Sequence, residues 1–146
     1  MKSIFVGLTA AAILAAGMVS LEAQGTPRSS WSGIFTSDQA DRGKQLFMDN
    51  CAKCHGANLA GDEAAPQLAG PDFLNNWNGE NVADLVDRIH TTMPADNPGK
   101  LSLASATDVA AFILSSNQMP AGTAELPRDQ PVQALIRIDG LNPAAK

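Results

Sequence analysis

The sequence predicts an all-α fold with three main helices, followed by an extended, proline-rich C-terminal tail. Two observations support this class. Segments in residues 36–55, 81–94 and 105–117 each show helical spacing of apolar or small residues, with residues suited to starting or ending a helix. No convincing strand pattern lies near the first of them. The chain has 146 residues, 45% of them hydrophobic, which is enough for one domain with a buried core.

The first 23 residues carry the pattern of a secretory signal peptide. A positive charge at Lys2 precedes an apolar stretch over residues 4–19. Because a membrane-spanning helix needs roughly 20 apolar residues, this shorter stretch predicts cleavage, which we place after Ala23, and no stable membrane span in the mature chain. Leu21 departs from the small residue preferred at that distance from the cut, so an uncleaved anchor remains the alternative.

The mature chain is acidic. Cleavage after Ala23 removes one of 10 basic and one of 15 acidic side chains, and it leaves the net charge at −5. Such a charge disfavours binding to nucleic acid and to anionic membrane surfaces, and it favours partners that carry basic patches. We therefore expect protein partners and no nucleic acid.

Residues 36–55 are expected to begin with a helix that runs toward the cysteine pair. Thr36 can act as its N-cap, and Gln39, three residues later, completes a capping box. Gly43 and Phe47 lie four residues apart and share one face, where a glycine lets another backbone come close. The alternative is a glycine of no consequence on a solvated helix, since an isolated helical glycine is tolerated.

Two further helices are expected downstream. The first, in residues 81–94, has Asn81 as its N-cap. Its apolar stripe follows i, i+3, i+4 and i+7 spacing and consists of Val82, Leu85, Val86 and Ile89. The second, in residues 105–117, ends at Asn117. Its helical stripe consists of Val109, Phe112, Ile113 and Ser116. We expect this second helix to be the last of the domain.

The two ends of the mature chain lie outside the predicted domain of residues 36–117. Residues 24–35 are polar and contain proline, which predicts a loose N-terminal arm with Trp31, Ile34 and Phe35 tucked onto the domain. Residues 118–146 are rich in proline and contain one short apolar stretch. This composition indicates an extended segment that wraps the domain or a partner, with disorder as the alternative.

The stretch DNCAKCHGANL, residues 49–59, holds both cysteines and one of the two histidines: Cys51, Cys54 and His55. A redox dithiol would need a thioredoxin-like alternation of strands and helices, which the sequence does not support. A zinc site usually needs four ligands, and no second cysteine pair or His-x3–5-His follows. Covalent haem attachment explains all three residues, because each thiol adds across a haem vinyl group and the imidazole lies under the iron. We therefore expect one covalently bound haem c.

Together with the helices around it, this motif resembles the class I c-type cytochromes, which are all-helical electron carriers. The likeness runs from about Thr36 to Asn117. It implies the cytochrome c fold, with the three main helices around one covalently attached haem, and it implies that Phe112 packs against Gly43 and Phe47. Haem is attached to such motifs outside the bacterial cytoplasm, so the resemblance agrees with export to the periplasm.

The resemblance and the chemistry of sulfur both favour Met93 as the sixth iron ligand. Pro94 cannot continue the helix, and it pushes Met93 toward an extended conformation at the start of a loop, where the thioether can turn inward. A thioether suits a soft or borderline metal, and in the family the sixth ligand is a methionine downstream of such a helix, commonly followed by proline. Met119, which also precedes a proline, and His90, which would give bis-histidine ligation, are the competing ligands.

The resemblance also implies roles for residues around the haem. The run GDEAAPQLAG looks like the family's loop below the haem, where the carbonyl of Pro66 would accept the hydrogen bond of His55 and hold one tautomer. Leu68 would cover the haem. Trp77 would donate its indole N–H to a haem propionate, and simple packing of Trp77 at the haem rim is the alternative.

Two functions remain open. An electron carrier needs only a six-coordinate haem that is buried except for one edge, whereas a peroxidase or small-molecule oxidoreductase needs an exchangeable iron position and an acid–base residue beside it. Met93 would fill that position, and His90 is the one obvious acid–base candidate, so we expect a carrier with no catalytic residues. The motifs are also similar to small cytochromes associated with periplasmic quinoprotein dehydrogenases, which implies such a dehydrogenase and a terminal oxidase or other acceptor as redox partners.

Overall fold

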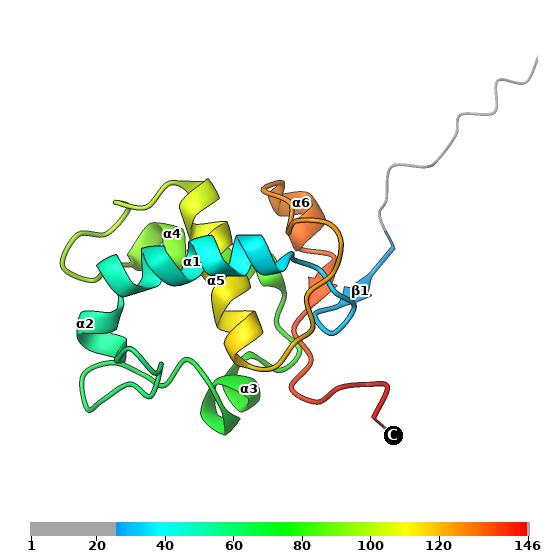
Figure 1. Cartoon of the computed structure of the whole chain (residues 1–146), viewed down its shortest axis with the longest axis horizontal. Coiled ribbons are helices and arrows are strands. Elements are labelled where there is room, and N and C mark those ends of the chain that lie inside the picture. The colour runs from blue at the N-terminus through cyan, green and yellow to red at the C-terminus, as the bar shows by residue number, and fades with distance from the viewer. Residues whose placement is uncertain (1–25, 146) are drawn as a thin grey trace, which may run out of the picture.

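The computed structural model describes residues 26–145, so the signal peptide expected in residues 1–23 lies outside the described residues. This part of the chain contains six helices and two short strands (Figure 1), in the order β1 (Arg28–Ser29), α1 (Ser37–Asn50), α2 (Ala52–His55), α3 (Pro71–Trp77), α4 (Val82–Thr92), α5 (Leu103–Ser116), α6 (Gln130–Gln133) and β2 (Ile136–Arg137). The helical class is confirmed. The prediction of three main helices is incomplete, because the structure contains α2, α3 and α6 in addition to the expected α1, α4 and α5. No helix in this described range is both long and apolar enough to cross a membrane.

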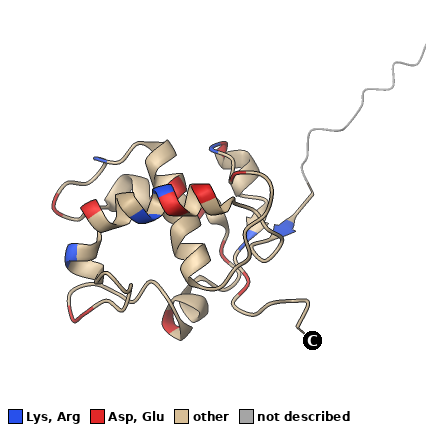
Figure 2. Ribbon diagram, in the orientation of Figure 1, with Lys and Arg blue, Asp and Glu red and all other residues tan. Residues whose placement is uncertain are grey.

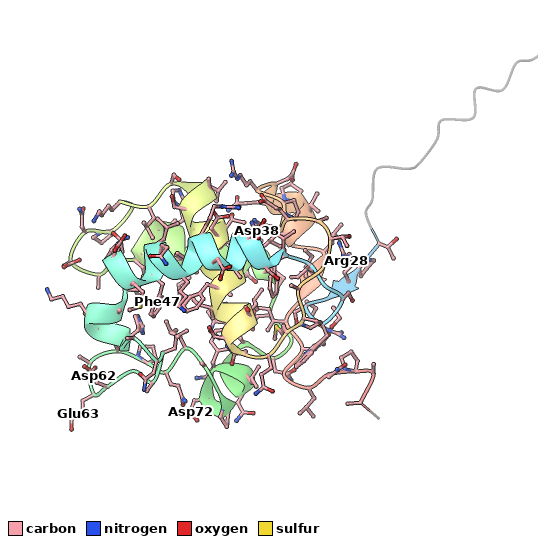
Figure 3. All side chains as sticks on the ribbon, viewed as in Figure 1. Arg28, Asp38, Phe47, Asp62, Glu63 and Asp72 are labelled. Atoms are coloured by element: carbon pink, nitrogen blue, oxygen red, sulfur yellow. The ribbon has the colours of Figure 1, made fainter. Side chains whose placement is uncertain are left out.

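Basic and acidic residues are distributed along most of the ribbon and do not gather in one segment (Figure 2). Asp62 and Glu63 lie on the loop between α2 and α3, and Asp72 lies on α3, along the edge opposite α1 (Figure 3). Asp108 of α5 is buried and only 6% exposed. Arg42 of α1 pairs with it at 3.2 Å and, through another nitrogen, with the exposed carboxylate of Glu125 at 2.7 Å. Hydrogen bonds to these two carboxylates raise the pKa of Arg42 above its ordinary value.

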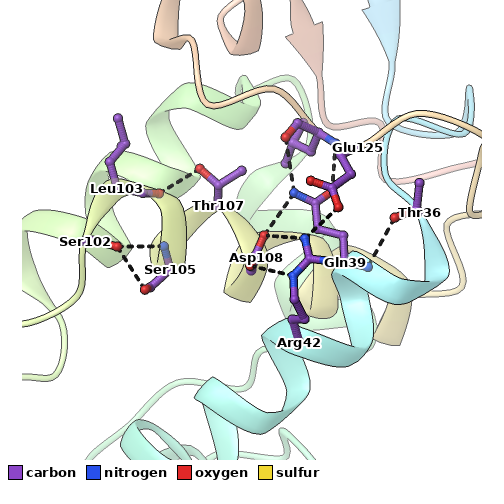
Figure 4. Close-up of polar contacts among 10 residues, drawn as sticks. Thr36, Gln39, Arg42, Ser102, Leu103, Ser105, Thr107, Asp108 and Glu125 are labelled. Carbon is purple, nitrogen blue, oxygen red and sulfur yellow. Dashed lines mark hydrogen bonds and ion pairs between the residues drawn. The ribbon is translucent and has the colours of Figure 1, made fainter.

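The start of α1 follows the predicted cap only in part. Thr36 has an extended backbone, and its hydroxyl accepts the N–H of Gln39 at 3.2 Å. The Gln39 side chain is fully buried and donates to the carboxylate of Asp108 at 3.1 Å (Figure 4). It also accepts the backbone N–H of Leu126 at 2.7 Å. The capping box is therefore wrong, because the Gln39 amide is satisfied by partners in the core and does not return to Thr36.

The long helices α1 and α5 cross one another with their backbones in contact (Figure 1). A Cβ atom on Gly43 would overlap the carbonyl oxygen of Asp108 and would lie 3.0 Å from the Cβ of Phe112. The rings of Phe47 and Phe112 pack with their centroids 5.3 Å apart. The expected contact of Phe112 with Gly43 and Phe47 is confirmed, and Gly43 is required by close packing.

Helix α4 begins at its predicted cap, where the side chain of Asn81 accepts the N–H of Asp84 at 3.0 Å. Its four stripe residues are buried: Val82, Leu85, Val86 and Ile89. Helix α5 begins two residues before the predicted segment, because the hydroxyl of Ser102 accepts the N–H of Ser105 at 3.1 Å and caps it. Most of α5 is buried, since α1, α4 and the C-terminal tail pack around it.

The N-terminal arm is fixed by contacts with the distant C-terminal segment. β1 pairs in parallel with β2, and the indole N–H of Trp31 donates to the carbonyl of Asp139 at 2.8 Å. Two residues at the end of the arm are buried: Ile34 and Phe35. The expectation that Trp31, Ile34 and Phe35 tuck onto the domain is confirmed, because Ile34 and Phe35 belong to the core and Trp31 packs against it. The expectation that the arm is otherwise loose is wrong for residues 26–35, because strand pairing holds it on the domain.

The C-terminal tail returns along the domain and contains α6 and β2, so it is not uniformly extended. The N–H of Gly79 donates to the carbonyl of Ile138 at 2.8 Å, and the N–H of Ile138 donates to the carbonyl of Glu80 at 2.8 Å. Leu126 and Ile136 are each 1% exposed. The tail thus packs against the turn between α3 and α4, and α6 follows the helix that the sequence predicted to be the last.

Candidate functional site

A cavity of about 1290 Å³ opens between α1, α2, α3, α4, α5 and the loops that follow α2 and α4. Pockets for small molecules typically hold about 300–1,000 Å³, so this cavity suits a large group. Its surface is more apolar than polar. All six site residues predicted from the sequence line it: Cys51, Cys54, His55, Pro66, Trp77 and Met93.

The two cysteines reach this cavity from the junction between α1 and α2. Cys51 ends α1 by donating its N–H to the carbonyl of Phe47 at 2.8 Å, and its own carbonyl accepts the N–H of His55 at 3.0 Å. Cys51 is half-buried and Cys54 is exposed, and both are free thiols. Burial, with a smaller contribution from Cys54, raises the pKa of Cys51 to about 11. The Cys51 thiol is therefore neutral near pH 7.

His55 is held in one orientation by the loop after α2. Its Nδ1 lies 2.9 Å from the carbonyl oxygen of Pro66, and the side chain is buried. A carbonyl only accepts, so Nδ1 carries the hydrogen, and Nε2 of the neutral ring is the nitrogen left to bind a metal. Gly61 fixes the loop with a φ of +66°, and a Cβ there would lie 2.6 Å from the carbonyl carbon of Pro66. The close turn at Gly61 thus brings the Pro66 carbonyl to His55.

Met93 approaches the cavity from the end of α4. It is the C-cap residue, with φ −119° and ψ 150°, and its N–H donates to the carbonyl of Ile89 at 3.2 Å. The extended backbone agrees with the expectation from Pro94. Among the methionines of residues 26–145, Met93 lines the cavity, whereas Met48 and Met119 do not.

His90 does not line the cavity, although it lies one turn before Met93. Its Nδ1 lies 2.7 Å from the carbonyl oxygen of Leu101, on the side of α4 that meets the start of α5. The geometry therefore disfavours bis-histidine ligation through His90, which the sequence left open.

Sequence reasoning missed several apolar residues of the cavity. Phe73 lines it from α3 and stacks on Trp77, with ring centroids 6.0 Å apart, while Val109 and Ile113 line it from α5. The i, i+4 spacing of Val109 and Ile113 was visible in the sequence. Such a stripe marks a buried face, but it does not distinguish packing against a helix from packing against a cofactor.

The residues present fit a haem. Two thiols and an imidazole with an available Nε2 lie at one side of a large, mainly apolar cavity, and a thioether lies in the same cavity. These are the donor types that hold haem covalently and ligate its iron. The carbonyl of Pro66 supplies the further hydrogen bond that orients such an imidazole.

Comparisons with known proteins identify a cytochrome family. Residues 38–113 match the family described as cytochrome c oxidase, cbb3-type, subunit III. The chain is similar to the cbb3-type cytochrome c oxidase subunit FixP of Sinorhizobium medicae (strain WSM419), with 38% identity over 79 residues that cover 51% of this chain and 27% of that protein. It is also similar to the thiosulfate dehydrogenase of Stutzerimonas stutzeri (strain A1501), with 34% identity over 85 residues, 54% of this chain and 27% of that protein.

The chain spans only about a quarter of the length of these curated relatives. Among solved structures, it is similar to the crystal structure of the sulfane dehydrogenase SoxCD from Paracoccus pantotrophus, with a TM-score of 0.46 and 23% identity, covering 81% of this chain and 61% of that one. The family match extends over more than half of the chain and includes the cysteine pair, His55 and Met93. The chain therefore belongs to the family of cbb3-type cytochrome c oxidase subunit III, as a c-type cytochrome domain that binds one covalently attached haem.

Proposed function

We propose that this protein is an exported monohaem c-type cytochrome that carries single electrons between redox partners, with His55 and Met93 as the residues that would ligate its iron. The observation that carries this proposal is that an imidazole with its Nδ1 hydrogen-bonded at 2.9 Å and a methionine thioether line one cavity. Bound haem supplies an iron centre that takes up and releases one electron.

Cys51 and Cys54 would hold the group covalently, through addition of each thiol S–H across a vinyl group, which needs no oxidant. Cys51 is the N-cap residue of α2, and Cys54 and His55 lie in that helix. Two covalent bonds and one metal bond from these five consecutive residues would keep the group in a fixed orientation.

Pro66, Leu68 and Trp77 are proposed to complete the site. The Pro66 carbonyl accepts the Nδ1 hydrogen, so Nε2 of His55 is the ring nitrogen that would bind a metal. Leu68 lines the cavity and excludes water from it. Trp77 also lines the cavity, and we propose that its indole N–H donates to a haem propionate.

The carrier function is favoured over an enzyme. A peroxidase needs an open iron position and an acid–base residue next to it. Met93 lines the same cavity as His55, which supports it as the residue that fills that position. The imidazole of His90, the obvious acid–base candidate, does not line the cavity and bonds to Leu101. A methionine ligand opposite histidine also raises the reduction potential, which suits a carrier.

The sequence and the names of the relatives support a proposal for export and for the redox partners. The signal-peptide pattern of residues 1–23 and the covalent haem motif both favour the periplasm. The relatives bear the names of an oxidase subunit and of a thiosulfate dehydrogenase. We propose that the partners are a periplasmic dehydrogenase, such as a quinoprotein dehydrogenase, and a terminal oxidase or other acceptor.

Replacement of Met93 by alanine tests the ligand assignment. The ferric wild-type protein should show the weak long-wavelength sulfur-to-iron charge-transfer band and should bind cyanide slowly. Met93→Ala should abolish the band, speed cyanide binding and lower the reduction potential, because the ferrous state loses its preferred soft ligand. Met48→Ala, at a methionine that is 44% exposed, is the matched control and should leave all three unchanged.

Two results would contradict the proposal in different ways. Fast cyanide or peroxide binding by the wild type would show an open iron position and would favour the enzyme. A charge-transfer band that survives Met93→Ala but disappears in Met119→Ala would keep the carrier and change the ligand.

A further inference from the structure

The loop that follows Met93 is closed by one side-chain hydrogen bond. Nδ1 of His90, in the last turn of α4, lies 2.7 Å from the carbonyl oxygen of Leu101. Leu101 is 5% exposed and immediately precedes Ser102, the N-cap of α5. The bond therefore joins the two places where the loop leaves and re-enters the folded domain. The loop runs between α4 and α5 in Figure 1, drawn in yellow-green.

The rest of this loop makes few contacts that could hold it. Residues 95–100 are all exposed. Within the loop, the N–H of Asn97 donates to the carbonyl of Pro94 at 2.9 Å, and the N–H of Lys100 donates to the carbonyl of Asn97 at 3.3 Å. These bonds shape the loop but do not attach it to the domain.

Within the described residues 26–145, a single ion pair connects the loop to the opposite side of the cavity, and it is weak. Nζ of Lys53 lies 4.0 Å from the carboxylate of Asp96, and the two side chains are 85% and 73% exposed. A pair of this kind contributes little, since water and salt screen it. His90 is thus the principal polar attachment of the segment that carries Met93 within residues 26–145.

The hydrogen bond does not depend on the charge of the imidazole. The Leu101 carbonyl can only accept, so Nδ1 donates in the neutral ring and also in the protonated ring. This hydrogen bond therefore does not act as a pH switch for the loop.

We propose that His90 is a positioning residue for the sixth ligand: it holds the loop of residues 93–101 closed, so that the sulfur of Met93 stays on the iron and external ligands seldom enter. This inference rests on the proposed function, because it requires Met93 to be the ligand. His90 would affect the iron only indirectly, because its hydrogen bond holds the backbone at Leu101, and His90 itself does not line the cavity. In an electron carrier, this role suppresses reaction with small molecules.

Two substitutions of His90 distinguish the effect of the hydrogen bond to Leu101 from the effect of having any polar side chain at position 90. The side-chain nitrogen of asparagine takes the place of Nδ1, so His90→Asn retains the donor. The nitrogen of glutamine takes the place of Nε2, one bond further out, so His90→Gln retains polarity but misplaces the donor. Both residues are polar and suit the partly exposed position, so both variants should fold.

The experiment measures the rate of cyanide binding to the ferric, haem-loaded protein and the temperature at which the charge-transfer band disappears. Loss of one neutral hydrogen bond should make loop opening, and hence cyanide binding, about 3- to 10-fold faster in His90→Gln, and the band should disappear at a lower temperature. His90→Asn should behave like the wild type. Lys100→Ala, on an exposed loop residue whose bond to Asn97 uses the backbone, is the control and should not differ.

Equal cyanide rates for His90→Gln and wild type, or for His90→Gln and His90→Asn, would overturn the positioning role. Failure of this inference is distinguishable from failure of the proposed function. If Met93→Ala abolishes the band while His90→Gln exchanges ligand at the wild-type rate, Met93 remains the ligand and His90 does not position it. If the band survives Met93→Ala, the ligand assignment itself fails.

Discussion

Gly43 of α1 lies against the carbonyl oxygen of Asp108 in α5, with no room for a side chain between the two backbones. This contact sets the depth at which the two long helices cross. It also brings the rings of Phe47 and Phe112 to a centroid distance of 5.3 Å. Because Phe47 and Val109 both line the cavity, the crossing helps to determine the shape of that cavity.

Gly43→Ala should therefore destabilise the protein. At an ordinary helix position this change stabilises by roughly 0.5–1 kcal/mol. Here the added Cβ overlaps a backbone oxygen, which cannot rotate away, and overpacking of this kind costs about 1–3 kcal/mol. Urea unfolding of the haem-loaded protein measures the change. Lys44→Ala, at the exposed neighbouring residue, should alter stability by less than about 0.5 kcal/mol. A stabilised Gly43→Ala protein would show that the helices do not cross this closely.

Asp108→Ala should also destabilise the protein. Its carboxylate accepts a hydrogen bond from the fully buried amide of Gln39 at 3.1 Å, and an unsatisfied buried donor costs about 1–3 kcal/mol. Glu125 is the matched control, because it is an exposed acidic residue that pairs with Arg42 of the same network (Figure 4). Glu125→Ala should have little effect on the urea midpoint. Equal losses in the two variants would mean that surface charge, and not the buried amide, governs stability here.

The C-terminal tail should contribute to the stability of the domain. Leu126 is 1% exposed, and its backbone accepts from and donates to the side chain of Gln39. Leu126→Ala should cost about 2–5 kcal/mol by leaving a cavity in the core. Val132→Ala, at a tail residue that is 44% exposed, should change stability by less than about 0.5 kcal/mol. If both variants unfold at the wild-type midpoint, the tail is not part of the folded unit.

Local signals in the sequence were sufficient to predict the long helices and the attachment motif. The N-caps at Thr36 and Asn81 were correctly predicted because a short polar side chain can bond only to backbone a few residues away. The stripe that begins at Val82 identified the buried face of α4 because its period is that of a helix. The motif of Cys51, Cys54 and His55 indicated haem because few other chemistries use these residues at this spacing.

Contacts between distant parts of the chain were the features that sequence could not supply. Gln39 looked like part of a capping box, but its partners are Asp108 and Leu126, 69 and 87 residues away. The arm looked loose because the segment that pairs with β1, at the far end of the chain, cannot be recognised from the arm alone. The hydrogen bond between His90 and Leu101 was likewise not predictable. Its acceptor is a backbone carbonyl, which every residue has, so the identity of residue 101 does not indicate the bond.

Covalent attachment should be evident in the mass of the purified chain. Protein produced in a host that attaches haem to such motifs should retain the haem after acid–acetone extraction, with no free thiol, because Cys51 and Cys54 both become thioethers. His55→Ala should keep the haem attached but lose the low-spin spectrum, since the thiols remain while the imidazole is absent. Extraction of the haem to leave two thiols or a disulfide would reject covalent attachment.

The acidic surface should govern reaction with charged redox reagents. The net charge of −5 attracts cations and repels anions, and these effects weaken as salt shortens the Debye length from about 10 Å at 0.1 M. Reduction of the ferric protein by hexaammineruthenium(II), a cation, should therefore slow as salt rises. Oxidation of the ferrous protein by ferricyanide, an anion, should speed up. Stopped-flow measurement over a range of ionic strength gives both slopes.

Variants that each remove one carboxylate charge then show which part of the protein surface the redox reagents approach. Asp87 is exposed and lines the cavity from α4, whereas Asp41 is exposed on α1 and does not line it. Both Asp87→Asn and Asp41→Asn change the net charge by one, but the reagents exchange electrons close to the cavity, where the field of a nearby carboxylate is stronger. Asp87→Asn should therefore flatten both salt slopes more than Asp41→Asn does. Equal changes in the two variants would mean that the whole molecular charge, and not the carboxylates beside the cavity, steers the reagents to the protein.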